Sequence, residues 1–202
     1  AAQLRAEGVD TPERGGARDA RPPANPRLVG LYATAFVAMG VFVSMYNFFG
    51  FRAVLGTWSS ARAGLVYVVY LSGTWSSARA GALSRRYGRG VVVMASAAMM
   101  LLGALAVAAS SLWIAFAGLL TFTASFFALH STASGRVGLI AERDRAEASS
   151  MYVPCYYMGS SILGAATGWA YEGLPWAGFV AVLAALLGAL ALVAAALWKG
   201  AR

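Results

Sequence analysis

Charged residues, cysteine and histidine are all scarce in this chain of 202 residues. Only 12% of the residues are charged and 59% are hydrophobic, whereas about a quarter of the residues in soluble domains are charged. The single cysteine, Cys155, excludes a disulfide framework and a cysteine metal site. His130 is the only histidine, and no Asp or Glu lies inside an apolar stretch. A bilayer is therefore the expected solvent, and we predict no metal and no cofactor.

Six apolar stretches have roughly the length of about 20 residues that a membrane-spanning helix needs. They predict an all-α membrane protein with six transmembrane helices, at residues 28–51, 64–83, 91–110, 112–133, 151–171 and 177–198. The polar, Pro- and Gly-bearing residues 1–27 are predicted to be a flexible cytoplasmic linker. The bundle then occupies residues 28–198, and residues 199–202 form a cytoplasmic tail.

Basic residues are concentrated on one side of these stretches. Thirteen lie there: Arg5, Arg14, Arg18, Arg21, Arg27, Arg85, Arg86, Arg89, Arg136, Arg143, Arg145, Lys199 and Arg202; the opposite side carries only Arg52 and Arg62. Because Lys and Arg near span ends resist translocation, we expect a multi-pass protein of the inner (plasma) membrane with both termini cytoplasmic. This placement and anionic lipid explain the net charge of +8 without a nucleic-acid partner.

Polar side chains follow the order polar, polar, apolar twice along the six stretches. Stretches three and six have almost none, so they are expected to face lipid. The other four are predicted to face a protein interior or a wet cavity. Their polar residues are Thr34, Ser44, Tyr46 and Asn47; Tyr67, Tyr70, Thr74 and Ser77; Thr121, Thr123, Ser125 and His130; and Tyr152, Tyr156, Ser160 and Thr167. The repeated order indicates two three-helix units.

Helical spacing places several of these residues on shared faces. At 3.6 residues per turn, the polar residues of the second stretch share one face, and so do those of the fifth. Gly164 and Gly168 form a small-residue pair that lets another helix approach closely. In the fourth stretch, Thr121 and Ser125 lie opposite His130, and the sequence leaves open which of the two faces is wet.

Most of the polar residues permit two interpretations. His130 can carry a proton or contact a substrate, or it can hydrogen-bond a neighbouring helix. Asn47 and Tyr46 can contact a substrate or cap the outer helix end at the aromatic belt. The two hydroxyl-bearing stripes are compatible with interhelical packing and with substrate contact.

A nine-residue string occurs twice, at residues 56–64 and again at residues 73–81. The two copies are identical and start 17 residues apart, in different environments. A local duplication or an assembly error explains them better than a functional repeat, because a solenoid needs at least three copies.

The second copy runs into the segment Gly-Ala-Leu-Ser-Arg-Arg-Tyr-Gly-Arg at residues 81–89. It resembles the loop motif of the major facilitator superfamily, Gly-x-x-x-Asp-Arg-x-Gly-Arg, with Gly81, Arg86, Gly88 and Arg89 matching and Arg85 replacing the usual Asp. Residues 46–52 and 126–135 are similar to the carboxy-terminal half of arabinose-efflux-like members of the drug:proton antiporter branch. The resemblance covers about residues 27–198.

This resemblance implies that the six stretches are helices seven to twelve of a twelve-helix carrier. In that family, the first and fourth helices of each half line the central cavity, the second and fifth pack against the other half, and the third and sixth face lipid. The opening resembles the family's central linker and lacks methionine, so we expect a missing amino-terminal half. The alternative is a half-transporter that works as a homodimer.

The resulting prediction is a transporter, not an enzyme. It moves a small molecule by alternating access, and the resemblance implies proton-coupled efflux of a drug-like or sugar-like solute. A non-transporting scaffold subunit is the alternative. An intramembrane protease is disfavoured, because Thr132-Ala133-Ser134-Gly135 lacks the opening glycine of a Gly-x-Ser-Gly turn.

Overall fold

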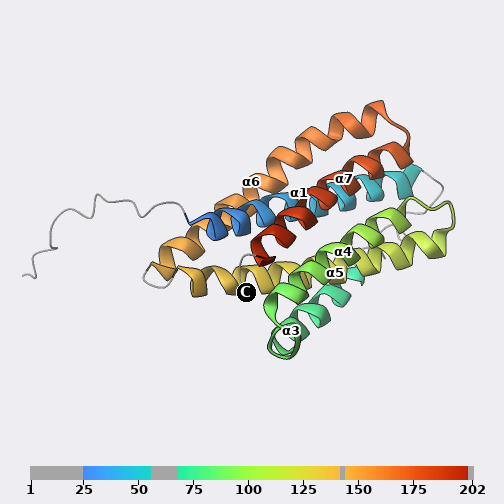
Figure 1. The fold of residues 1–202 in the computed structure, drawn as a ribbon. Helices are drawn as coiled ribbons and strands as arrows, with labels where there is room; N and C mark the ends of the chain where they lie inside the picture. The colour runs from blue at the N-terminus through green and yellow to red at the C-terminus, as the bar shows by residue number, and fades with distance from the viewer. Residues whose placement is uncertain (1–24, 56–67, 142–143, 200–202) are drawn as a thin grey trace, which may run out of the picture.

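The computed structural model describes residues 25–55, 68–141 and 144–199 of the chain. This part contains six helices and no strand (Figure 1). The helices are α1 (Pro26–Leu55), α3 (Tyr70–Tyr87), α4 (Arg89–Val107), α5 (Leu112–Ile140), α6 (Arg145–Gly173) and α7 (Trp176–Lys199). The prediction of an all-α membrane protein is confirmed.

Four of the helices are apolar and long enough to cross a membrane: Pro26–Phe51, Arg89–Val107, Trp113–Ile140 and Trp176–Ala196. The other two, α3 and α6, are not among them, because α3 carries several hydroxyl and arginine side chains and α6 begins with polar residues. Whether α3 and α6 also cross the bilayer stays a prediction.

Helix boundaries depart from the predicted spans where polar residues continue a helix. The first helix begins at Pro26, where the side-chain Oδ1 of Asn25 accepts a hydrogen bond from the Arg27 amide at 3.0 Å. Pro26 supplies no amide hydrogen at a position that needs none. Residues 26 and 27 thus belong to α1 and not to the predicted linker, and Lys199 belongs to α7 and not to the predicted tail. Residues 1–24 and 200–202 lie outside the described residues.

The segment 81–89 is not an extended loop. Gly81 to Tyr87 are the last turns of α3, and Arg89 already begins α4. Gly88 alone joins the two helices, with φ 86° and ψ 143°, a conformation that favours glycine because it has no Cβ. The second copy of the repeated string is therefore helical, whereas the first copy lies outside the described residues.

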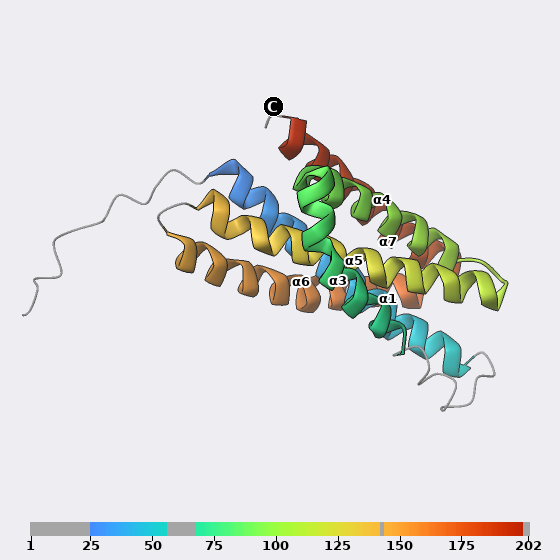
Figure 2. The same ribbon diagram turned by 90° about the horizontal axis from the view of Figure 1, so that it is seen from below.

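The six helices form two layers of three. Each layer contains helices from both three-helix units that the sequence predicts, because α1 and α5 have changed places. One layer holds α1, α6 and α7 and the other holds α3, α4 and α5 (Figure 1). The second helix of each unit packs on the first helix of the other unit, α6 on α1 and α3 on α5. The two layers meet along α1, α4, α5 and α7, with α4 and α7 side by side (Figure 2). This interlocked arrangement agrees with the two three-helix units that the polar pattern indicates.

The main hydrophobic core lies between these four central helices. Its fully buried members include Met45 of α1, Met100 of α4, Phe122 of α5 and Leu183 of α7. A smaller cluster, around Leu31 and Val137, closes one end of the bundle between α1, α5 and α6.

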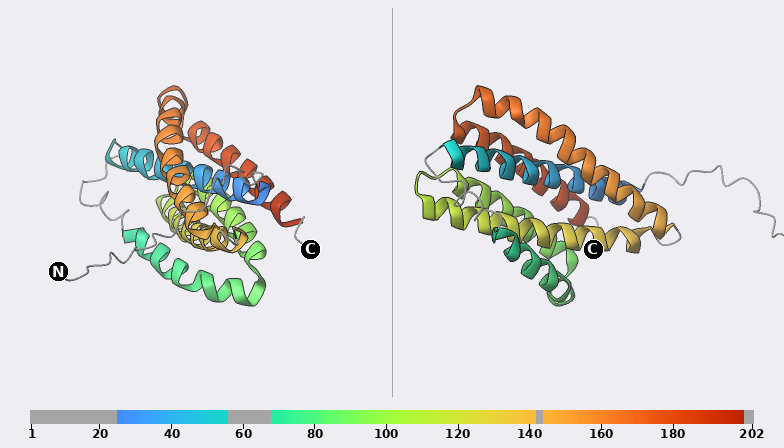
Figure 3. Two further views of the ribbon diagram at one scale, coloured as in Figure 1. Left: turned by 90° about the vertical axis from the view of Figure 1, so that its left-hand side faces the viewer. Right: turned by 180° about the vertical axis from the view of Figure 1, so that it is seen from behind.

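The helices α3 and α6 lie at opposite edges of the bundle and are the least covered (Figure 3). Only Gly73, Ser76 and Ala80 of α3 are buried, and only four residues of the 29 in α6. Large apolar side chains on both remain exposed, among them Trp75 and Trp169. The sixth helix, α7, is the least buried of the four apolar helices, at 33% against 50% for the others. The expectation of a mostly lipid-facing helix thus suits α7 better than α4.

Candidate substrate cavity

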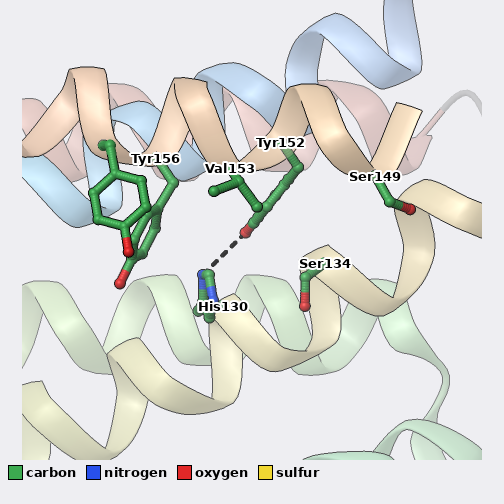
Figure 4. Close-up of a pocket in the computed structure, with 7 residues that line it drawn as sticks. His130, Ser134, Ser149, Tyr152, Val153 and Tyr156 are labelled. Atoms are coloured by element: carbon green, nitrogen blue, oxygen red, sulfur yellow. Dashed lines mark hydrogen bonds between the residues drawn. The ribbon is translucent and has the colours of Figure 1, made fainter. Parts of the chain in front are cut away.

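A cavity of about 300 Å³ lies between α5 and α6 (Figure 4). It is lined by three tyrosines, two serines, a histidine and a valine: Tyr152, Tyr156, Tyr157, Ser134, Ser149, His130 and Val153. The lining therefore combines aromatic surfaces with hydroxyl groups and one imidazole, and it contains no carboxylate. Such a surface can stack on a flat ligand and hydrogen-bond to it.

His130 is held from two sides by its neighbours. Its Nδ1 atom lies 3.1 Å from the Tyr152 hydroxyl, the hydrogen bond that joins α5 to α6 in this region (Figure 4). The imidazole stacks on Phe126 at 5.8 Å and approaches the ring of Tyr156 at 5.0 Å. Within the described residues, its Nε2 atom has no hydrogen-bond partner, so it is the nitrogen that can meet a ligand; it can also take up a proton when Nδ1 carries the hydrogen of the neutral ring.

Helical spacing explains why these groups converge. Phe126, His130 and Ser134 follow one another at intervals of four residues on α5, as Tyr152 and Tyr156 do on α6. Residues four apart lie on the same side of a helix. Each helix thus presents one polar and aromatic face to the other, and Tyr152 is buried in the contact while Tyr156 is half-buried.

A second aromatic cluster lies deeper in the bundle, where α1, α3 and α5 meet. Phe42 stacks on Phe126 at 4.0 Å and meets Tyr46 at 4.8 Å and Tyr70 edge-on at 5.7 Å. The Tyr46 hydroxyl lies 2.6 Å from Thr123 Oγ1, which is 2.8 Å from the Leu119 carbonyl oxygen. Tyr46 thus donates to Thr123, and Thr123 donates to its own helix. In this structure the Tyr46 side chain is therefore buried with its hydroxyl hydrogen-bonded, and a substrate contact by Tyr46 stays a prediction.

The remaining predicted cavity residues do not join His130. Thr121 donates to the Ala117 carbonyl at 2.9 Å and lines a groove between α4 and α5, and Ser125 lines another groove beside α3. The face of α5 with His130 therefore lines the cavity, and the face with Thr121 and Ser125 does not.

Three further candidates also lie away from the imidazole. Thr74 is exposed on α3, and Ser160 donates to the Tyr157 carbonyl at 2.8 Å. Asn47 is exposed and does not cap a helix end, because α1 continues for two more turns to Leu55. Tyr67 lies outside the described residues.

Among the glycines where α1 and α6 meet, Gly40 and Gly159 have the tightest surroundings, not the predicted pair Gly164 and Gly168. A Cβ atom at Gly40 would lie 2.6 Å from Leu163 Cβ, and one at Gly159 would collide with the backbone of Phe36. At Gly164 and Gly168 it would meet Val43 and Phe48 at 4.0 and 3.6 Å, which are ordinary contacts. Beside this contact, Ser44 Oγ and Thr167 Oγ1 lie 2.6 Å apart, and both are buried.

The sequence is similar to those of several known transporters. No protein-family profile matches the sequence. The chain is 45% identical over 159 residues to the inner membrane transport protein YnfM of Escherichia coli, covering 78% of this chain and 38% of that protein. It is 34% identical over 165 residues to an uncharacterized transporter of Buchnera aphidicola subsp. Schizaphis graminum, covering 81% and 40%. It is 30% identical over 164 residues to the uncharacterized MFS-type transporter YybF of Bacillus subtilis, covering 80% and 40%.

The relatives are named as transporters, and that of Bacillus subtilis as an MFS-type transporter, which agrees with the resemblance to the major facilitator superfamily. The chain spans about two fifths of the length of the relatives it matches. In the superfamily numbering implied by the sequence, the cavity lies between the fourth helix of the half, α5, and the fifth, α6. None of the described residues forms a group of three or more potential metal ligands.

The superfamily loop motif lies at the end of the bundle that also carries the start of α1. Gly81, Arg85, Arg86, Gly88 and Arg89 are all exposed, and the Arg86 guanidinium lies 5.2 Å from the centre of the Tyr87 ring. Arg27 and Arg89 lie in the first turns of α1 and α4, and Arg136 lies in the last turns of α5. We call this end of the bundle the arginine end. The arginine at position 85 adds positive charge where the motif usually has a carboxylate.

Proposed function

We propose that the chain is one six-helix half, the carboxy-terminal one, of a transporter that moves a small molecule by alternating access. In this mechanism, two helical bundles rock about a shared cavity and expose it to one side of the membrane at a time. Similarity to named transporters, one of them MFS-type, and the cavity between α5 and α6 support the proposal. The observation that carries it is a polar cavity around His130 in a bundle with a mainly apolar core.

Proton coupling through His130 is part of the proposal. Imidazole is the side chain that most readily gains and loses a proton near neutral pH. The groups that face it are the two phenols of Tyr152 and Tyr156 from α6 and the Phe126 ring from α5. With Nδ1–H donating to the Tyr152 hydroxyl, a proton gained at Nε2 would leave the Tyr152 contact in place while placing positive charge in the cavity. Binding of a proton and of a substrate would then compete for the same space.

The proposed direction is efflux of a drug-like or sugar-like solute across the inner membrane. Aromatic rings suit flat apolar molecules and also the faces of sugar rings, and hydroxyl groups can serve both. The name of the Escherichia coli relative, an inner membrane transport protein, supports the location. The arginine end supports an orientation with both termini in the cytoplasm.

A complete transporter needs a second bundle, either an amino-terminal half or a second copy of this chain. The exposed apolar faces of α3 and α6 support such a partner, because these edge helices have the fewest buried residues. The span of about two fifths of the relatives' length supports it as well.

The test measures proton release in everted membrane vesicles from cells that produce the chain. The vesicles are energised, and quenching of acridine orange reports their internal acidity. Addition of ethidium, as a drug-like probe, or of arabinose, as a sugar-like probe, should relieve the quenching if the solute exchanges for protons. Vesicles with His130→Gln should show no relief, because an amide can still hydrogen-bond to the Tyr152 hydroxyl but binds no proton.

The matched control is Ser150→Ala, an exposed residue of α6 whose hydroxyl bonds only to the Glu147 carbonyl. It should behave as the unmodified chain does. Full relief in His130→Gln vesicles would contradict the role of the histidine. Failure of radiolabelled ethidium and arabinose to move at all, with or without a gradient, would mean that the chain does not transport by itself, as expected of a scaffold or of a half that lacks its partner.

A further inference from the structure

A second hollow, of about 280 Å³, lies on the opposite side of α5, between α3, α4 and α5. Apolar side chains make up most of its wall, and three of them, Leu83, Val91 and Met99, are exposed at the surface of the bundle. Three serines also line it: Ser76, Ser96 and Ser125. We call it the serine groove.

The three serines differ in how their hydroxyl groups are satisfied. Ser76 donates to the Ala124 carbonyl at 2.6 Å and so joins α3 to α5. Ser96 and Ser125 are only 8% and 6% exposed, yet neither forms a hydrogen bond with the described part of the chain. Their oxygens are not sealed in, unlike the buried hydroxyl oxygens of Ser84 and Thr132. Two unpartnered donors therefore open into one groove.

The depth of these hydroxyls limits what can satisfy them. Ser96 is seven residues from Arg89 along α4, and Ser125 is eleven residues from Arg136 along α5. At 1.5 Å per residue, they lie about 10 and 16 Å from the arginine end, well inside a hydrocarbon layer of about 30 Å. Acyl tails offer no acceptor, and an unsatisfied polar group in hydrocarbon is costly. Phospholipid ester groups stay near the surface of that layer, above the serines.

We propose that the serine groove binds an uncharged, membrane-soluble molecule that carries a carbonyl or ether oxygen. The molecule reaches the groove from the bilayer past Leu83 and Met99, and its oxygen accepts hydrogen bonds from Ser96 and Ser125. Its lack of charge follows from the wall, in which Tyr87 is the only side chain that can ionise. The site is separate from the His130 cavity, because Ser125 and His130 are about 140° apart around α5. It does not depend on the proposed transport.

The test uses 4-octylbenzophenone, a neutral ketone that attaches covalently to nearby C–H bonds on illumination. The full chain is placed in nanodiscs of dioleoylphosphatidylcholine with less than one probe molecule per protein chain. Labelled peptides are identified by mass spectrometry. Labelling should concentrate on the α4 segment with Met99. An excess of 2-undecanone, an aliphatic ketone that does not photolabel when the benzophenone is excited, should suppress it, whereas 4-octyldiphenylmethane, which has the shape of the probe without the oxygen, should not.

Variants then separate the hydroxyls from the apolar wall. Ser96→Ala and Ser125→Ala should each weaken labelling at Met99 by about fivefold, the effect of losing one hydrogen bond. Ser161→Ala, an exposed serine on α6, is the matched control and should change nothing. Ala95→Phe should abolish labelling by filling the groove while leaving both serines in place. Circular dichroism serves as the check that each variant keeps its helices.

Two results would overturn the proposal. Labelling at Met99 that is equal in the serine variants would mean that apolar contact alone holds the probe. Labelling spread evenly over lipid-facing residues such as Trp75 and Trp169 would mean that no site exists. Neither result bears on ethidium or arabinose transport, so this proposal and the proposed function fail separately.

Discussion

Alanine substitutions at four glycines of α1 and α6 test the helix contact that organises one layer of the bundle. At Gly40, a Cβ would lie 2.6 Å from Leu163 Cβ and 2.7 Å from the Gly159 carbonyl oxygen, whereas ordinary contacts begin near 3.4 Å. The helices would have to separate by about 0.8 Å to accept it. At Gly159, the obstacle is the backbone of Phe36, which cannot rotate away as a side chain can.

The expected cost follows from this overpacking. An added methyl group in a tight contact costs ~1–3 kcal/mol, partly offset by the better helix propensity of alanine, about 1 kcal/mol. Gly164→Ala and Gly168→Ala gain the same propensity without a clash, because their nearest neighbours are 4.0 and 3.6 Å away. The difference in unfolding free energy between the two pairs is therefore ~1–3 kcal/mol, with Gly159→Ala the least stable.

The measurement is unfolding of the purified chain in dodecylmaltoside micelles titrated with sodium dodecyl sulfate, followed by far-ultraviolet circular dichroism. Because all four variants change glycine to alanine on two helices, propensity and detergent effects cancel in the comparison. A larger loss at Gly164 or Gly168 than at Gly40 and Gly159 would refute the packing described here. That result would instead favour a close helix contact at Gly164 and Gly168, as the small-residue pattern predicts.

Two more predictions use the same titration. The unfolding free energies of Ser44→Ala, Thr167→Val and the double variant should give a coupling energy of about 0.6 kcal/mol, and at most ~1.7 kcal/mol, as for other hydrogen bonds between membrane helices. Strictly additive effects would show that the 2.6 Å contact between the two hydroxyl oxygens contributes nothing to stability. Gly88→Ala should lower the unfolding free energy by ~1–3 kcal/mol because residue 88 has a positive φ. Gly81→Ala should lower it much less, because its Cβ would meet only the Arg85 guanidinium, at 3.7 Å. Equal effects would contradict a strained turn at Gly88.

The helices and their order could be predicted from sequence because a backbone in hydrocarbon must satisfy its own hydrogen bonds. The ends could not, since a helix continues beyond the hydrocarbon as long as its backbone bonds persist. Thus α5 extends seven residues past the predicted span, to Ile140, and α6 begins six residues early, at Arg145.

The cavity was predictable only in part. His130, Tyr152 and Tyr156 stand out as polar groups at membrane depth, and the structure brings them together. Thr121 and Ser160 stand out equally, but each hydroxyl bonds to a carbonyl of its own helix and needs no polar neighbour. Four other residues line the cavity and were missed, because a single helix does not reveal which face its neighbour covers: Ser134, Ser149, Val153 and Tyr157.

The choice among glycines has a similar cause. Several small residues lie on α6, and any of them permits a close approach. The one that is used depends on where α1 crosses, and that point is set by both layers together.

The exchange of α1 and α5 between the layers also bears on how the chain is made. Ser44 and its partner Thr167 are 123 residues apart. At a synthesis rate of about 5–20 residues per second, α1 waits roughly 6–25 s in the membrane before α6 leaves the ribosome. During that time, the Ser44 hydroxyl can rest on the Gly40 carbonyl of its own helix, 2.7 Å away. The Ser44 hydroxyl of a nascent α1 is thus hydrogen-bonded before α6 is made. The layer of α1, α6 and α7 assembles only late in translation.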